Sequence, residues 1–392
     1  MLAAMALVGM AGLGALGRAL AIDVVGSAST HTATTVVVGG QAGLAEIGEA
    51  ARFAKRAVEV PFESQLDTAV APLDALRGEA PRLHVFVSND WDVPNHEAST
   101  FLLQERLHAS HPELRVTHYV GPYLFTDASV PFGMAEEHVA WLRRVEAAHG
   151  DEIGLHIHPY SSLVEEAGLS STGRAPYFTS PRVGRDPGYS LNLGAAFDEA
   201  ETRQLLLRSR ELFLEHGLPE PTAFRAGGWT ADAHTLRALA DTGFRSDASA
   251  VPVELLGSWI TNGEPLYPWL KRTWEGIDTG SQPYFPSKQR PNVAGDLPLL
   301  EIPDNGALAD YMTTDRMTAL FDQLVGQMNA DGKSRVLSIG YHGVSLPNHF
   351  PRIDGALRYI DSKLASSGLG PAVYSTAREI ADLFGQTPRA MN

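Results

Sequence analysis

The feature of this sequence that most restricts its fold is a regular alternation of two kinds of segment, which begins at about Pro81. Short apolar or β-branched runs predict strands, and apolar residues at helical spacing predict helices between most of them. The predicted strands are residues 83–88, 115–120, 152–158, 222–226, 244–249, 297–303, 335–342 and 372–374. The predicted helices are residues 135–149, 199–216, 231–242, 315–328 and 353–366. This alternation indicates an α/β protein whose helices lie outside a parallel sheet, either a barrel or a doubly wound sheet.

The composition narrows the class of protein further. A chain of 392 residues with 44% hydrophobic content can bury the core of one large or two ordinary domains. Its 31 basic and 46 acidic residues give a net charge of −15, which disfavours nucleic acid and anionic lipid as partners. The chain has no cysteine. Disulfides, thiolate nucleophiles and cysteine-ligated zinc are therefore excluded, and any metal must be held by oxygen or imidazole nitrogen.

Residues 1–80 form an N-terminal extension before the predicted barrel. Residues 1–17 carry no charge, and the apolar character resumes after Arg18 as far as Ile22. The stretch is short and rich in glycine for a membrane span, and it lacks the basic residues that precede a signal peptide's apolar run. Two interpretations stay open for residues 1–22: an export signal or membrane anchor, or a loosely packed helix. Membrane contact is expected only if this segment is an anchor.

Two predicted connections, residues 161–198 and 250–296, are far longer than an ordinary loop between strand and helix. They contain the large aromatic residues Tyr177, Phe178, Trp259, Trp269, Trp274, Tyr284 and Phe285. So many aromatic side chains are costly to leave in solvent. They either pack the loops onto the barrel or line a cleft.

Acidic and imidazole side chains recur at the ends of the predicted strands. Asp90 and Asp92 follow the first strand, and His156 and His158 lie at the end of the third. Because residues two apart in a strand share a face, each pair projects to one side. A turn is the simpler interpretation of the aspartates alone, but together the two motifs offer carboxylate and imidazole ligands for a metal.

Two further motifs lie at later strand ends. Arg225 stands in the run Phe-Arg-Ala-Gly-Gly-Trp, where its guanidinium can hold a carboxylate or form a structural salt bridge. His342 ends the seventh predicted strand. Neither residue alone identifies a site.

The order of these motifs resembles that of the polysaccharide deacetylase family, also called carbohydrate esterases of family four. The likeness covers about residues 81–384, and it includes the ending at residues 374–382. It implies a distorted (β/α)7-8 barrel over residues 81–385, with long loops, and a divalent metal held at the C-terminal mouth by one Asp and two His. Zinc suits such ligands first, with cobalt, nickel or manganese as alternatives.

Carried over residue by residue, the resemblance makes Asp90 the general base, oriented by Arg225, and His342 the acid that protonates the leaving group. Asp92, His156 and His158 are then the metal ligands. Two departures from the family pattern are evident. Trp91 separates the two acids, which adjoin in the family's T-F-D-D, and the family's H-x-x-x-H-P is shortened to His156-Ile157-His158-Pro159. Because Tyr160 stands four residues after His156, His158 must supply the second imidazole.

We therefore expect a metal-dependent hydrolase that removes an acyl group, first of all acetyl, from an amide or ester of a carbohydrate or polysaccharide. The aromatic residues expected to bind the substrate are Trp91, Tyr160, Trp229 and Tyr284. One alternative is a noncatalytic carbohydrate-binding barrel. The other is a metal-dependent amidohydrolase acting on a small C–N substrate, in which H-x-H would lie on the first barrel strand rather than the third.

Overall fold

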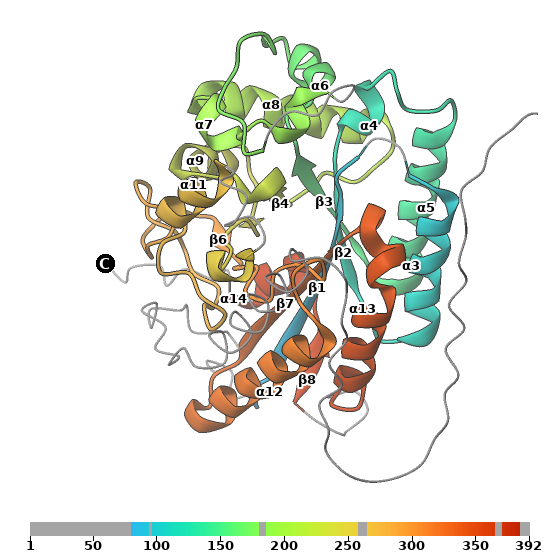
Figure 1. Ribbon diagram of the computed structural model, residues 1–392, viewed down its shortest axis with the longest axis vertical. Coiled ribbons are helices and arrows are strands. Elements are labelled where there is room, and N and C mark those ends of the chain that lie inside the picture. Colours follow the sequence, from blue (N-terminus) through green and yellow to red (C-terminus); the bar gives the residue numbers. More distant parts are fainter. Residues whose placement is uncertain (1–79, 94–95, 180–185, 258–264, 365–370, 385–392) are drawn as a thin grey trace, which may run out of the picture. The chain divides into compact units, whose positions relative to one another are not determined.

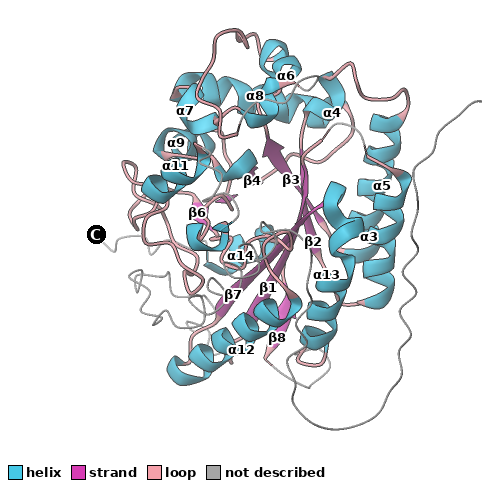
Figure 2. Cartoon of the chain, viewed as in Figure 1, coloured by secondary structure: helices cyan, strands magenta, loops and turns pink. Residues whose placement is uncertain are grey.

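Eight parallel strands form one sheet that helices cover, as the computed structural model of the protein shows (Figures 1 and 2). The described residues are 80–93, 96–179, 186–257, 265–364 and 371–384. The strands are β1 (Leu83–Trp91), β2 (Val116–Val120), β3 (Glu152–Ile157), β4 (Ala223–Ala226), β5 (Ser246–Asp247), β6 (Leu300–Glu301), β7 (Arg335–His342) and β8 (Ala372–Tyr374). The helices are α3 (Ala98–Ser110), α4 (Tyr123–Thr126), α5 (Met134–His149), α6 (Ser161–Glu166), α7 (Leu193–Ala196), α8 (Glu199–Glu215), α9 (Ala233–Asp241), α11 (Leu266–Thr273), α12 (Thr314–Asp331), α13 (Leu346–Asp361) and α14 (Ala377–Phe384).

The predictions for residues 1–22, for the extension up to residue 79 and for Trp259 lie outside the described residues. Among the helices that the structure does describe, none combines the length and the apolar character needed to cross a membrane.

The strand register brings predicted site residues together. The strand order is β6-β5-β4-β3-β2-β1-β7, and β8 lies beside the first half of β1. In the parallel ladders, Asp90 on β1 is the partner of His342 on β7, and His156 on β3 is the partner of Arg225 on β4. Since all these strands run the same way, the four residues lie at one edge of the sheet.

The sheet curls because the segment after β6 returns to β7. The Gly340 N–H donates to the Ala307 carbonyl at 2.9 Å, and the Ala309 N–H donates to the Gly340 carbonyl at 2.8 Å. Just before Ala307, a Cβ at Gly306 would lie 2.0 Å from the Ser338 carbonyl oxygen, so only glycine allows the two segments to come this close. The parallel sheet forms a half-barrel with helices between its strands, which confirms the predicted distorted β/α barrel over a flat doubly wound sheet.

All eight predicted strands are present, but their lengths differ from the prediction. β1 continues through Trp91, whereas β5 and β6 keep 2 residues each. Around these short strands, some backbone groups bond to side chains. The Ala226 N–H donates to Ser249 Oγ at 2.9 Å, and the Ala250 N–H donates to a Glu301 carboxylate oxygen at 2.8 Å.

The helices α3 and α13 show where periodicity misleads. The buried positions of α3 include polar Gln104 and His108, so its sequence lacks the apolar stripe that predicts a helix. Helix α13 begins at Leu346 and contains Pro351, and a proline inside a helix is a strong signal against it. The sequence therefore predicts this helix only after the proline.

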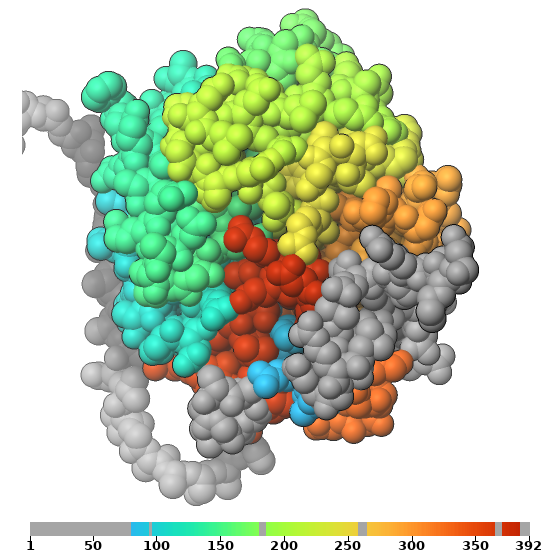
Figure 3. Space-filling model, turned by 180° about the vertical axis from the view of Figure 1, so that it is seen from behind, coloured from blue at the N-terminus to red at the C-terminus, as the bar shows by residue number. Residues whose placement is uncertain are grey.

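Helix α14 packs against the inward-facing residues at the other end of the sheet. Its Ile380 and Phe384 belong to a buried cluster with Phe86 on β1 and Tyr119 on β2. Figure 3, which views the molecule from behind, shows red residues from the late part of the chain between green and yellow regions of the surface. The open mouth of the half-barrel is thus left at the carboxyl ends of the strands.

Two carboxyl groups meet inside the sheet. Asp247 and Glu301 are register partners on β5 and β6, and both are fully buried. Ser249 Oγ donates to Asp247 Oδ1 at 2.7 Å. Burial raises the pKa of Asp247 to about 6 and holds the pKa of Glu301 well above its usual range. Two buried carboxylates side by side repel, so the pair holds a proton near neutral pH.

This pair makes stability depend on pH. Burial raises the folded-state pKa values of both carboxyl groups. The contribution of the pair to the free energy of unfolding is therefore fully present below about pH 4 and is lost as pH rises through about 6. We expect Asp247→Asn to raise the free energy of unfolding at pH 8 relative to the unsubstituted protein by on the order of 1–2 kcal/mol, because it removes a buried carboxylate that is ionised there, and to gain less at pH 5. Urea denaturation at both pH values measures this, with the exposed Glu275→Gln as control. Equal pH slopes in the unsubstituted protein and Asp247→Asn would show that burial does not raise the pKa of Asp247.

Candidate active site

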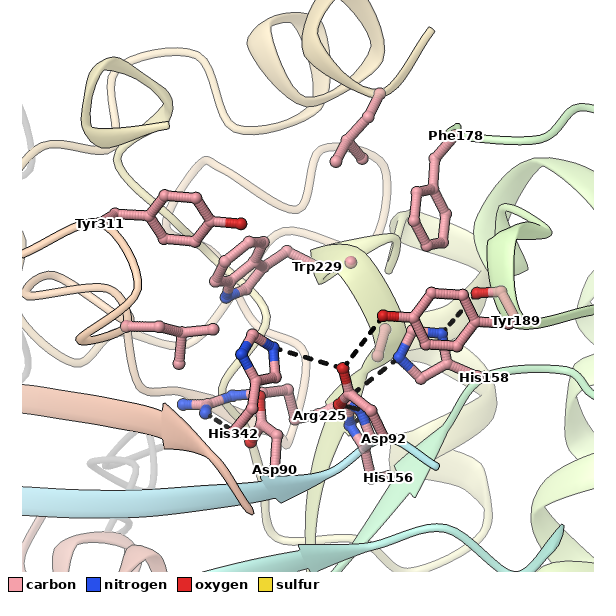
Figure 4. A pocket seen from close by; sticks show the side chains of 14 residues that line it. Asp90, Asp92, His156, His158, Phe178, Tyr189, Arg225, Trp229, Tyr311 and His342 are labelled. Atoms are coloured by element: carbon pink, nitrogen blue, oxygen red, sulfur yellow. Dashed lines mark hydrogen bonds and ion pairs between the residues drawn. The ribbon is translucent and has the colours of Figure 1, made fainter. Parts of the chain in front are cut away.

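The predicted chemical residues meet in one pocket at the carboxyl ends of the strands (Figure 4). The cavity has a volume of about 60 Å³. Its lining residues are Asp90, Asp92, His156, His158, Phe178, Tyr189, Arg225, Ala226, Gly228, Trp229, Leu266, Leu308, Tyr311 and His342. The structure therefore gathers all six residues predicted as catalytic or metal-ligating, with an aromatic and aliphatic wall around them.

At the end of β1, successive side chains point to opposite faces of the sheet. Asp90 and Asp92 face the pocket, while Trp91 points to the other side of the strand, as period-two alternation requires. The Trp91 ring stacks on Phe101 at 5.5 Å, and its carbonyl accepts a hydrogen bond from the Tyr123 hydroxyl. Trp91, which was expected to bind substrate, thus lies in the core and fixes the strand between the two acids.

The Asp92 carboxylate lies close to the imidazoles of His156 and His158. Its Oδ1 lies 3.1 Å from His156 Nε2 and 3.7 Å from His158 Nε2. All three side chains are buried and form a group that could hold a metal ion. Burial raises the pKa of Asp92, but the nearby His342, His156 and His158 lower it by more, so the net pKa lies well below its usual range.

The other ring nitrogens decide how these imidazoles can bind. His156 Nδ1 lies 2.9 Å from the Arg225 carbonyl oxygen, and His158 Nδ1 lies 2.6 Å from the Tyr189 carbonyl oxygen. A carbonyl only accepts, so each Nδ1 carries the proton and each Nε2 presents a lone pair toward Asp92. Metal-ligating histidines are oriented by this kind of outer contact. The donor set fits a divalent metal ion with Asp92, His156 and His158 as ligands.

Arg225 connects Asp90 to the barrel interior. Its Nη1 donates to Asp90 Oδ1 at 2.9 Å and to Ser88 Oγ at 2.8 Å, and its Nε donates to the Ala248 carbonyl at 2.9 Å. Its Nη2 lies 3.5 Å from an oxygen of Asp304. These contacts hold the Asp90 carboxylate in one orientation at the pocket floor.

His342 faces the same carboxylate from β7. Its Nε2 lies 3.3 Å from Asp92 Oδ2, and its Nδ1 lies 3.1 Å from Asp310 Oδ2. Burial alone would lower the pKa of His342, but Asp92, Asp310 and Asp90 together raise it to about 10. The ring is therefore held as an imidazolium in this arrangement.

Three residues that contact the predicted site residues are not singled out by the sequence. Tyr189 comes from the long insertion 161–198, and its hydroxyl lies 3.3 Å from Asp92 Oδ2. Asp304 follows β6, and its Oδ2 accepts the Trp229 indole N–H at 2.9 Å. Asp310 orients His342. Asp304 shares with Asp90 a position near the end of a strand, which could have drawn attention to it, whereas Tyr189 and Asp310 lie in loops without such a signal.

The remaining aromatic predictions separate into two groups. Trp229 lines the pocket, and from the insertions Phe178 does so too. Tyr160 and Tyr284 do not line it: the Tyr160 hydroxyl donates to the Asp92 carbonyl at 3.1 Å, and the Tyr284 hydroxyl donates to the Pro291 carbonyl at 2.7 Å. Trp274 and Phe285 are also buried. Most aromatic side chains of the insertions therefore pack these loops onto the barrel.

A second buried group, His108, His118 and Asp151, also has metal-like spacing. His118 Nε2 and His108 Nε2 lie 3.0 and 2.9 Å from Asp151 Oδ2. However, the Trp91 indole N–H donates to His118 Nδ1 at 3.4 Å. That nitrogen then carries no proton, so Nε2 carries it and donates to Asp151. His118 is thus oriented by Trp91 and Asp151, and its Nε2 offers no lone pair in this arrangement.

Of the comparisons with known proteins, the one with solved structures found similar chains. No protein-family model matches the chain, and no curated protein sequence does. A solved structure assigned as a polysaccharide deacetylase from Mycobacterium smegmatis is 16% identical with a TM-score of 0.47, over 80% of this chain and 95% of that one. A glycoside hydrolase/deacetylase from Parabacteroides distasonis is 11% identical with a TM-score of 0.48, over 78% and 71%.

The chitin deacetylase from Colletotrichum lindemuthianum is 12% identical with a TM-score of 0.38, over 79% of this chain and 91% of that one. The chain resembles polysaccharide deacetylases. Because these TM-scores lie below 0.5, the function proposed below is built on the side chains of the pocket.

We expect Asp92→Ala, His156→Ala and His158→Ala each to abolish metal binding, because an open site with three protein ligands cannot hold an ion firmly with two. Metal content after dialysis against zinc measures this, and the fold should persist by circular dichroism. His234→Ala removes an exposed imidazole and serves as control. Full metal content in His158→Ala would mean that a different residue supplies the third ligand.

Proposed function

We propose that this chain is a metal-dependent hydrolase that removes an acyl group, first of all acetyl, from an amide or ester of a carbohydrate. The observation that carries the proposal is the joint placement of three functions in one pocket. Asp92, His156 and His158 form the candidate metal-ligand group. The carboxylate of Asp90 and the imidazole of His342 lie beside it.

A divalent ion at the candidate metal-ligand group would polarise the substrate carbonyl and lower the pKa of a water molecule toward about 7. Zinc suits one carboxylate and two imidazoles best, and cobalt, nickel or manganese are alternatives. Asp92, His156 and His158 would hold the ion, and their outer contacts keep both Nε2 atoms directed at it.

Asp90 takes the role of general base. It lines the pocket, and Arg225 holds it through Oδ1. This contact fixes the orientation of the carboxylate, which would accept a proton from the attacking water.

His342 takes the role of general acid. It approaches from β7, the neighbour of β1, and Asp310 orients the ring through Nδ1, which leaves Nε2 directed into the pocket. From that nitrogen it can protonate the departing amine or alcohol. Base and acid are thus register partners on adjacent strands.

A carbohydrate is the favoured substrate because aromatic rings line the pocket and the motifs resemble those of polysaccharide deacetylases. Phe178, Trp229 and Tyr311 provide apolar faces of the kind on which sugar rings stack. Nothing in the chain's charge favours nucleic acid as a partner.

Two rivals explain less of the pocket. A noncatalytic carbohydrate-binding barrel would need the aromatic wall, but not an acid and a base beside a candidate metal-ligand group. An amidohydrolase of the metal-bridging type would place H-x-H on the first strand and use a lysine. Here the motif ends β3, and no lysine is among the described residues that line the pocket.

We expect Asp90→Asn to retain the metal but lose turnover by ~10²- to 10⁴-fold, because the amide keeps the shape while it cannot accept the proton. Zinc content and hydrolysis of an N-acetylated chito-oligosaccharide measure the two effects. Asp315→Asn, an exposed substitution on α12, is the matched control. Normal turnover in Asp90→Asn would remove the proposed base.

The role of His342 can be tested with two leaving groups. An amine leaves only after protonation, whereas a phenolate of low pKa departs unaided. We therefore expect His342→Ala to impair hydrolysis of an N-acetyl sugar far more than hydrolysis of an activated aryl acetate. Equal losses on both substrates, together with a lower melting temperature, would assign His342 a structural role.

A further inference from the structure

The part of the insertion 161–198 that begins at Asp186 lies directly against the end of β3. Its 3-10 turn η1 (Pro187–Ser190) follows Asp186, whose Oδ2 accepts the Ser161 N–H at 2.9 Å and whose Oδ1 accepts the Gly188 N–H at 2.7 Å. A Cβ at Gly188 would lie 2.2 Å from the Pro159 carbonyl oxygen, so glycine alone permits the contact. The turn is thus attached to the residues that immediately follow His158.

From this turn, Tyr189 contacts two of the three candidate metal ligands (Figure 4). Its hydroxyl donates to Asp92 Oδ2 at 3.3 Å. Its ring stacks on the His158 imidazole, with centroids 4.5 Å apart and planes 11° from parallel. Its carbonyl accepts the His158 Nδ1–H at 2.6 Å.

The two imidazoles differ in how they are supported. His156 lies within β3 and is oriented by the Arg225 carbonyl of the adjacent strand β4. His158 lies one residue beyond the last residue of β3, Ile157, so the sheet does not orient it in the same way. Its support comes from Tyr189 and from Gly227, where a Cβ would lie 2.5 Å from His158 Nδ1.

The two oxygens of Asp92 also have different partners. Oδ1 faces both imidazole Nε2 atoms, while Oδ2 faces the Tyr189 hydroxyl and His342 Nε2. The hydroxyl therefore engages the oxygen that faces neither His156 nor His158. With Oδ2 occupied in this way, Asp92 would offer the ion one oxygen and leave a coordination position for water or substrate.

We propose that Tyr189, which the insertion supplies, is a positioning residue of the metal centre. It orients the short H-x-H motif so that both imidazoles can bind the ion. The inference rests on the proposed metal-dependent function. It adds that the insertion, besides lining part of the pocket, determines the affinity for the metal. The ring and carbonyl of Tyr189 set the His158 imidazole, and its hydroxyl sets the Asp92 carboxylate.

The test measures metal affinity rather than turnover. Tyr189→Phe keeps the ring and the carbonyl but removes the hydroxyl, and Tyr189→Leu also removes the stacking. We expect the Kd for zinc, measured by competition with a chromophoric chelator, to rise ~10- to 100-fold in Tyr189→Phe and further in Tyr189→Leu. In the cobalt-loaded protein, the visible d–d bands of Tyr189→Phe should differ from those of the unsubstituted protein, because the Asp92 carboxylate has lost its hydroxyl partner.

Tyr177→Phe is the matched control, because it removes a hydroxyl from the same insertion at a residue outside the pocket lining. Its Kd should equal that of the unsubstituted protein, and the melting temperature of the metal-free protein should be the same in Tyr189→Phe. Unchanged zinc affinity in both Tyr189 variants would overturn the inference while leaving the proposed function intact. A fall in metal-free melting temperature that accounts for the whole loss of affinity would also overturn it. An unsubstituted protein that binds no metal would refute the proposed function itself.

Discussion

The buried guanidinium of Arg225 is the constraint on which the centre of this structure depends. A positive charge that is 1% exposed loses its hydration and must be surrounded by acceptors. Asp90 and Asp304 supply carboxylates, and Ser88 and the Ala248 carbonyl supply further oxygens. These partners come from β1, from the region after β5 and from the segment after β6. One buried charge thus ties the candidate base to both sides of the half-barrel.

The parts that the sequence predicts are those governed by a local period. Alternation along a strand places Asp90 with Asp92 and His156 with His158, and the structure confirms the strands that carry them. The pattern of strand and helix likewise predicts the barrel, because parallel strands need crossover helices. For the same reason, candidate residues at strand ends could be expected to meet at one mouth before any coordinates were known.

The parts that the sequence does not predict depend on long-range packing. Tyr189 reaches Asp92 only because Gly188 allows its turn to lie on the Pro159 backbone, and no periodic pattern encodes that approach. Tyr284 was expected at the substrate, yet its hydroxyl finds a carbonyl within its own insertion. An aromatic residue in a long loop has the same composition signal whether it faces a ligand or the core, so only the packed structure separates the two.

The strand order has a consequence for how the protein is made. β1 is the first described strand, but its neighbours on the sheet include β7 and β8, and the contact between Arg82 and Ser334 spans 252 residues. During synthesis, β1 emerges long before the strand that completes its ladder, and contacts so distant in sequence form slowly. Until β7 arrives, Asp90 has no His342 beside it. A nascent chain therefore carries β1 with one edge unpaired until β7 and β8 have been made.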